Sequence, residues 1–131
     1  MPIQQQSLVE QHLGRWNPGD LAFLTALTAR DRHVRLESVW QRRESCSSWP
    51  DEMQPCFRVV LDFEGVVGFK LDWGGAAAQV MGFEIEDISD RQWESIRFLV
   101  NDWENDVIEL SCASITVVEV APLGLLRYAR E

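Results

Sequence analysis

The fold is decided by residues 81–112, which read Met81-Gly-Phe-Glu-Ile-Glu-Asp-Ile-Ser-Asp-Arg-Gln-Trp-Glu-Ser-Ile-Arg-Phe-Leu-Val-Asn-Asp-Trp-Glu-Asn-Asp-Val-Ile-Glu-Leu-Ser-Cys112. Apolar and polar residues alternate in three segments, a period of two that is typical of strands with one buried face. Glu84 and Glu86 fall on the outward side of the first segment. Polar turns that carry Trp93-Glu94 and Trp103-Glu104 separate the segments. The stretch therefore predicts an antiparallel meander with an acidic side.

Outside this stretch, further strands are predicted near residues 33–41, 57–64, 69–73 and 115–120, where apolar residues again recur at every second position. Gly65 follows one of these segments and permits a bend or bulge. Because the strands follow one another closely without helices between them, we expect antiparallel pairing rather than a parallel sheet.

Two helices are predicted before the first strand. Ser7-Leu-Val-Glu10 fits a capping box that opens a helix over residues 7–13, and Gly14 closes it. A second helix, capped by Asp20, follows from the helical spacing of apolar residues between 21 and 28. The predicted class is α+β: two short N-terminal helices, at about 7–28, packed on a twisted, mainly antiparallel sheet of about six or seven strands, at about 33–120. The whole chain, 1–131, is expected to form one domain.

Net charge is unevenly placed along the chain. Residues 1–58 carry seven acids and seven arginines, whereas residues 62–119 carry thirteen acids against three bases, a net of −10. Nucleic acid and anionic membranes are therefore excluded as direct partners, since both are bound through Lys and Arg. A solvated face that keeps the protein soluble is the alternative explanation. The arginines near residues 30–43 are expected to pair with the acidic half of the chain, within the molecule or across a dimer.

No catalytic or cofactor motif is present. The chain lacks a P-loop, a GxSxG elbow and an HExxH pair. Asp102, Glu104 and Asp106 resemble the start of a calcium-binding loop, but Val107 and Ala113 replace the required Gly and Glu. We therefore predict no enzyme activity, no cofactor and no metal.

The expected compartment is the cytoplasm. Three cysteines form an odd set without CxxC spacing, and the N-terminus lacks the pattern of a signal peptide. Both features favour reduced thiols. A loop predicted over residues 44–55 carries Trp49 and Met53, either as loop anchors or as exposed contact residues.

Two function classes remain. The first is a protein-binding module whose acids and turn tryptophans dock a basic partner, because Trp is frequent at interface hot spots and acidic surfaces speed association with basic targets. The alternative for both tryptophans is that they fill the core under the turns. The second class is a ligand-binding or enzymatic sheet fold with a pocket between sheet and helices, or a structural domain, with a homodimer through an exposed sheet edge left open. The residues assigned to partner binding in the first class are Asp87, Asp90, Trp93, Glu94, Asp102, Trp103, Glu104 and Asp106.

Three segments carry a resemblance to a known kind of protein: Phe57-x-Val-Val-Leu-x-Phe-Glu-Gly-Val66, Phe83-Glu-Ile-Glu-Asp-Ile-Ser-Asp-Arg-Gln-Trp-Glu94 and Asp102-Trp-Glu-x-x-x-Ile-x-Leu-x-Cys112. Over residues 57–112 the chain resembles small bacterial immunity proteins encoded beside polymorphic or contact-dependent toxins. The resemblance implies a cytoplasmic, non-enzymatic inhibitor that binds a toxin domain and occludes its active site. It implies no catalytic residue.

Overall fold

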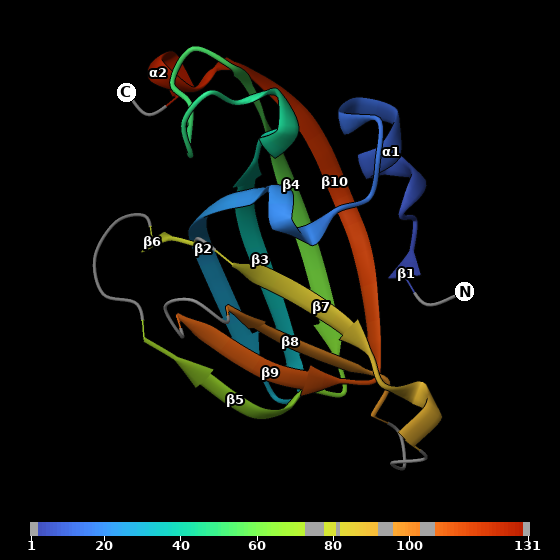
Figure 1. Ribbon diagram of the computed structural model, residues 1–131. Coiled ribbons are helices and arrows are strands. Elements are labelled where there is room, and N and C mark those ends of the chain that lie inside the picture. Colours follow the sequence, from blue (N-terminus) through green and yellow to red (C-terminus); the bar gives the residue numbers. More distant parts are fainter. Residues whose placement is uncertain (1–2, 73–77, 81, 92–95, 103–106, 130–131) are drawn as a thin grey trace.

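The computed structural model describes residues 3–72, 78–80, 82–91, 96–102 and 107–129. The described residues form two β-sheets that face each other across the core (Figure 1). Sheet A has the order β1-β10-β4-β3-β2-β6, with β1 at Ile3–Gln4, β2 at Leu21–Arg30, β3 at His33–Trp40, β4 at Pro55–Glu64, β6 at Ala78–Gln79 and β10 at Ser114–Leu125. Sheet B has the order β5-β9-β8-β7, with β5 at Val67–Leu71, β7 at Phe83–Asp87, β8 at Phe98–Asp102 and β9 at Ile108–Cys112.

The architecture is mostly β, so the predicted α+β class is wrong. Helical segments are short: α1 at Ser7–Leu13, α2 at Leu126–Ala129, and the 3₁₀ turns η1 at Pro18–Asp20, η2 at Arg43–Ser45 and η3 at Ser89–Arg91. No helix in the described part of the chain is long and apolar enough to cross a membrane. The prediction of mainly antiparallel pairing is confirmed, since every strand pair except β1–β10 is antiparallel.

The second predicted helix is in fact β2. Its pairing with β3 shifts register twice, between Leu21 and Phe23 and between Leu24 and Ala26. Each bulge inserts one extra residue into β2. Successive residues that point to the same face of the sheet are then three apart in the sequence, where a regular strand would place them two apart. The inward residues Leu21 and Leu24 consequently fall three apart, which imitates a helical stripe. Both faces of this part of β2 are buried, which also removes the alternation expected of a strand.

The first predicted helix lies at the expected residues. α1 ends at Gly14, whose left-handed φ of 80° lets its N–H donate to the Glu10 carbonyl. The predicted capping box is wrong: the residue that precedes the helix is Gln6, and no side chain caps the first turn. Val9 and Leu13 are buried, and the helix packs against β10 (Figure 1).

Two long bent strands connect the sheets. The chain passes from β4 in sheet A to β5 in sheet B at Gly65, and it returns from β9 to β10 at Ala113. Gly65 has a φ of 68°, which confirms the predicted bend, and a Cβ built there would lie 2.8 Å from the Ala113 Cβ. The Ala113 N–H donates to the Glu64 carbonyl at 2.8 Å and holds the two bends together.

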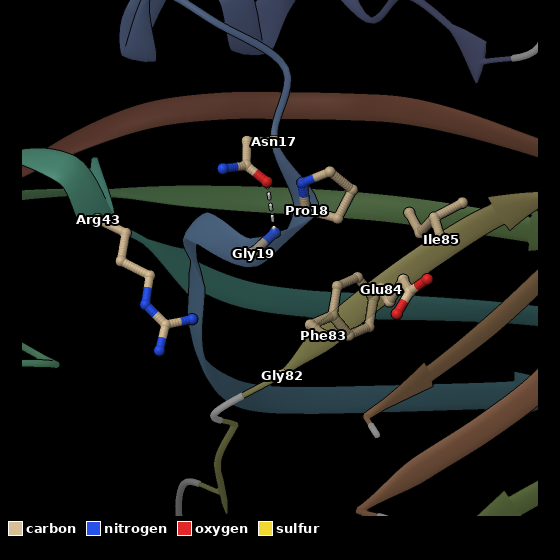
Figure 2. Close-up of a pocket in the computed structure, with 8 residues that line it drawn as sticks. All are labelled: Asn17, Pro18, Gly19, Arg43, Gly82, Phe83, Glu84 and Ile85. Atoms are coloured by element: carbon tan, nitrogen blue, oxygen red, sulfur yellow. Dashed lines mark hydrogen bonds between the residues drawn. The ribbon is translucent and has the colours of Figure 1, made fainter. Parts of the chain in front are cut away.

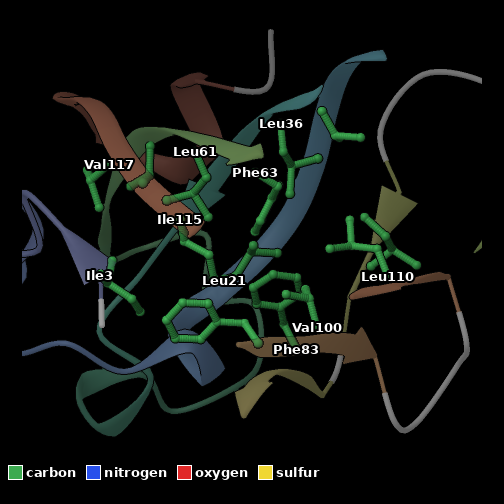
Figure 3. Packing of buried hydrophobic residues seen from close by; sticks show 14 of the residues in the cluster. Ile3, Leu21, Leu36, Leu61, Phe63, Phe83, Val100, Leu110, Ile115 and Val117 are labelled. Atoms are coloured by element: carbon green, nitrogen blue, oxygen red, sulfur yellow. The ribbon is translucent and has the colours of Figure 1, made fainter. Parts of the chain in front are cut away.

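The core lies between the inner faces of the sheets. Figure 3 shows side chains from both sheets packed together, with Ile3, Leu21, Leu36, Leu61, Phe63, Ile115 and Val117 from sheet A and Phe83, Val100 and Leu110 from sheet B. Trp40 is fully buried, and its indole N–H donates to the Ser38 Oγ at 2.9 Å. The Ser38 hydroxyl in turn donates to the Val59 carbonyl, so the polar atoms of this buried pair are satisfied.

The loop predicted over residues 44–55 is anchored by a buried glutamine. The Gln41 Nε2 donates to the Asp51 and Gln54 carbonyls, and the Gln41 Oε1 accepts from the Asp51 N–H. Trp49 packs against a small second cluster on the outer side of sheet A, whereas Met53 is 60% exposed. Of the two residues singled out in this loop, Trp49 is therefore an anchor and Met53 is exposed.

Candidate protein-binding face

The outer face of sheet B gathers acids around a small apolar centre. Register places Glu84, Asn101, Glu109 and Lys70 side by side in one row across the four strands. A second row consists of Glu86, Leu99, Ser111 and Val67. We call these eight outward residues the acidic face. Leu99 is half-buried and Val67 is 36% exposed, so an apolar patch lies among the carboxylates.

Lys70 is the one basic residue of this face. Its Nζ lies 3.7 Å from the Glu109 carboxylate, and its side chain is 80% exposed. An ion pair this long and this exposed contributes little attraction. Lys70 therefore offsets little of the negative charge of this face, and Asp72 directly after β5 adds to that charge.

The outer face of sheet A is different, because its Asp62, Glu37 and Glu119 side chains are paired with arginines of the same sheet. Arg35 makes two hydrogen bonds to the Asp62 carboxylate, at 2.7 and 2.9 Å, and the His33 ring lies 3.3 Å from the same group. The Arg35 guanidinium holds the pKa of Asp62 below its usual value. Arg58 bridges Glu37 and Glu119, and hydrogen bonding to Glu37 raises its own pKa.

The expected pairing of the arginines within the molecule is confirmed for Arg35. Arg42, another member of this basic segment, pairs with Glu44 at 2.7 Å. Before β2, Arg15 holds the buried Asp20 through two hydrogen bonds, at 2.7 and 3.2 Å. Asp20 therefore supports η1 and does not cap a helix.

The residues predicted to bind a partner have different positions. Asp87 and Asp90 are exposed at the end of β7 and in η3. The Asp87 carboxylate accepts from the Ser89 N–H, and hydrogen bonding to Ser89 lowers the pKa of Asp87. Asp102 is fully buried and accepts a 3.1 Å hydrogen bond from the Gly82 N–H, so it supports the start of β7. Trp93, Glu94, Trp103, Glu104 and Asp106 lie outside the described residues.

The acids that do form a face are Glu84, Glu86 and Glu109. Alternation in the sequence already placed the first two outward, but they were not assigned to partner binding. The signal that could have identified all three is the register of the meander, because it aligns outward residues of β7, β8 and β9 in rows.

A pocket of about 310 Å³ opens beside the free edge of β7 (Figure 2). Asn17, Pro18 and Gly19 of η1 form one wall, Arg43 closes one side, and Gly82–Ile85 form the opposite wall. The Asn17 Oδ1 accepts from the Gly19 N–H at 3.0 Å and fixes the turn that faces the strand. A second pocket, of about 300 Å³, lies between α1 and the start of β4 and includes His12, Arg42 and Phe57.

The described residues form no metal site, and their cysteine thiols are weak nucleophiles. No three His, Cys, Asp or Glu side chains of the described ranges gather closely enough to hold a metal ion. The three cysteines are free thiols, and burial raises the pKa of Cys46, Cys56 and Cys112, the last to about 12. Thiols with raised pKa values are poor nucleophiles at neutral pH.

Comparison with known proteins identifies a family for this chain. No curated protein and no solved structure matches this chain. A family model described as Immunity protein PIM8 matches residues 50–118, which is more than half of the 131-residue chain. The matched segment runs from the end of the 44–55 loop into β10 and includes every strand of sheet B, and with them the acidic face. The resemblance to immunity proteins is thus confirmed, and this chain belongs to the immunity protein PIM8 family.

Proposed function

We propose that this protein is a cytoplasmic, non-enzymatic inhibitor that binds a basic toxin domain through its acidic face and occludes the active site of that domain. Membership of an immunity family implies a protein partner such as a toxin, and such families are generally non-enzymatic. The observation that carries the assignment of the face is the contrast between the sheets. On sheet A, Arg35 pairs with Asp62 and Arg58 pairs with Glu37 and Glu119, whereas on the acidic face the ion pair of Glu109 with Lys70 is long and exposed.

The composition of the face fits this role. Half-buried Leu99 and exposed Val67 can be desolvated by a partner, and the acids around them supply attraction at the rim. Complementary charge at a rim accelerates encounter and selects the partner, while the apolar centre supplies affinity. A toxin that binds a phosphate-rich substrate presents a basic groove, which such a face can cover. Nucleic acid and anionic membranes carry the same charge sign as the face and are not proposed as partners.

A charge-reversal experiment tests the face. The test variant is Glu84→Lys with Glu109→Lys, and the partner is the toxin domain encoded beside this chain, with its catalytic residue inactivated. The control is Glu10→Lys with Glu64→Lys, which changes the net charge equally at exposed positions of α1 and β4. Calorimetry should show affinity for the toxin reduced at least about tenfold by the test variant and much less by the control.

Equal effects of the two variants would mean that net charge, and not this face, governs binding. In cells that express the active toxin, the same ranking is expected for survival. The small-molecule or structural alternative predicts no binding to the toxin by any variant.

A further inference from the structure

We propose that the free edge of β7 pairs with an extended, basic segment of the toxin, so that the partner adds a fifth strand to sheet B. This inference rests on the proposed function and specifies how the partner is held. It starts from the position of β7, which pairs with β8 on one side and with no other strand of the described chain. A free strand edge presents unpaired N–H and C=O groups that another chain can use.

The geometry of β7 suits strand addition. Its five residues pair with β8 in continuous register, without a bulge. The Ile88 N–H donates to the Arg97 carbonyl at 2.7 Å, which sets the alternation of bonded and non-bonded pairs along the strand. By this alternation the backbone groups of Phe83, Ile85 and Asp87 point away from β8, toward the free edge.

The opposite edge of sheet B is less suited. β5 shifts register against β9 between Val67 and Lys70, and Gly68 within that interval has a φ of 65°. A bulge bends an edge strand and interrupts the row of groups that a new strand would need. Lys70 adds a charge on the same edge strand. Of the two edges of sheet B, the straight one is β7.

The negative charge along β7 indicates which kind of strand would bind at its free edge. Glu84 and Glu86 lie on the outer face of β7 and Asp87 is exposed at its end, while Ile85 lies on the inner face. Two copies of this edge would place like charges opposite one another, which destabilises a pair of strands. A partner strand with Lys or Arg at alternate positions would instead place cations opposite Glu84 and Glu86. The occupant is therefore a basic segment of the toxin and not a second copy of this chain.

The pocket beside β7 adds a place for one side chain of that segment. Its walls include Pro18 and Phe83, and Glu84 lies at the same pocket (Figure 2). An arginine or lysine could lay its aliphatic stem against the apolar wall with its cation near the Glu84 carboxylate. η1 packs beside β7, so the added strand would use the end of the edge that lies toward Asp87.

Hydrogen exchange of the complex tests the backbone pairing. The probe is the catalytically inactivated toxin domain, bound to the full-length chain. Exchange of the Ile85 and Asp87 amides should slow at least tenfold on binding, whereas the Glu84 and Glu86 amides, which face β8, should change little. Binding with unchanged exchange at Ile85 and Asp87 would overturn the inference while leaving the acidic face as the site. Absence of any binding would overturn the proposed function itself.

A matched pair of variants gives a second test. Ile85→Pro removes the outward N–H and keeps the ladder to β8, because Pro is tolerated at an edge where its nitrogen faces away. Ile85→Ala removes a similar amount of inward packing and keeps the N–H. Affinity for the toxin should fall at least tenfold further in Ile85→Pro than in Ile85→Ala, and equal affinities would refute the pairing. Sedimentation of the free chain should show a monomer, and a dimer lost in Ile85→Pro would assign the edge to a second copy instead.

Discussion

Replacing Gly65 by alanine should destabilise this protein far more than the same change at Gly68. Both glycines have left-handed backbones, with φ values of 68° and 65°. A non-glycine residue pays about 1–2 kcal/mol in that conformation. The surroundings differ: a Cβ at Gly65 would lie 2.8 Å from the Ala113 Cβ, whereas nothing lies within 4 Å of a Cβ at Gly68.

The steric contact at Gly65 determines how much more stability the Gly65→Ala variant loses. Overpacking of a well-filled site costs about 1–3 kcal/mol, and it applies to Gly65→Ala alone. We expect a loss of about 2–5 kcal/mol in the free energy of unfolding for Gly65→Ala and about 1–2 kcal/mol for Gly68→Ala. The gain of about 0.4–1 kcal/mol from a less flexible unfolded chain is common to both changes and cancels in the comparison.

Urea denaturation of the three proteins measures these losses directly. The m-value should stay constant, because the surface exposed on unfolding is unchanged. Gly124→Ala is a further control, since its φ is 81° and nothing lies within 4 Å of the added Cβ. A Gly65→Ala variant no less stable than the Gly68 and Gly124 variants would refute the claim that close contact at the bend holds the two sheets in place.

Three further outcomes are expected. Asp102→Ala should lower the free energy of unfolding by about 1–3 kcal/mol, because the buried Gly82 N–H loses its acceptor; unchanged urea denaturation would contradict this role. Arg35 lowers the pKa of Asp62, so the contribution of Asp62 to stability is present above its ordinary pKa of about 3.9 and is lost as pH falls through the lowered value. The stability difference between the wild type and Asp62→Asn should therefore shrink in urea titrations below about pH 4. Cys112, with a pKa of about 12, should react with a thiol reagent at pH 8 only after unfolding, as followed by absorbance.

Alternation in the sequence was sufficient for β7, β8 and β9 of sheet B, but it misplaced β5, which begins at Val67 and carries a register shift. In the segment before η3, Phe83 points inward and Glu84 points outward as predicted. Alternation is informative there because one face is buried and the other meets solvent. It failed in β2, where bulges and burial on both faces hide the period, and this failure produced the wrong fold class.

The site could be predicted only in part, because it depends on contacts between residues that are far apart in the sequence. Asp102 is polar and precedes a turn, so sequence reasoning placed it on the surface; its burial depends on the Gly82 amide, twenty residues away in the chain. The division into two sheets depends on the alignment of Gly65 with Ala113, which no local pattern encodes. Glu109 joins the face only through the register of β9 with β8.

The distribution of the arginines is the strongest argument against solubility as the sole role of the acids. A solubilising charge works best when it is spread, because crowded like charges repel one another. The chain contains arginines that could have neutralised either sheet, and Arg35 and Arg58 form ion pairs with acids on sheet A. Among the eight residues of the acidic face, Lys70 is the one base, and its ion pair with Glu109 is long and exposed. Repulsion among the carboxylates of the acidic face lowers the stability of the free protein. Binding of a basic partner would remove this repulsion, which supports the proposal that a toxin covers the face.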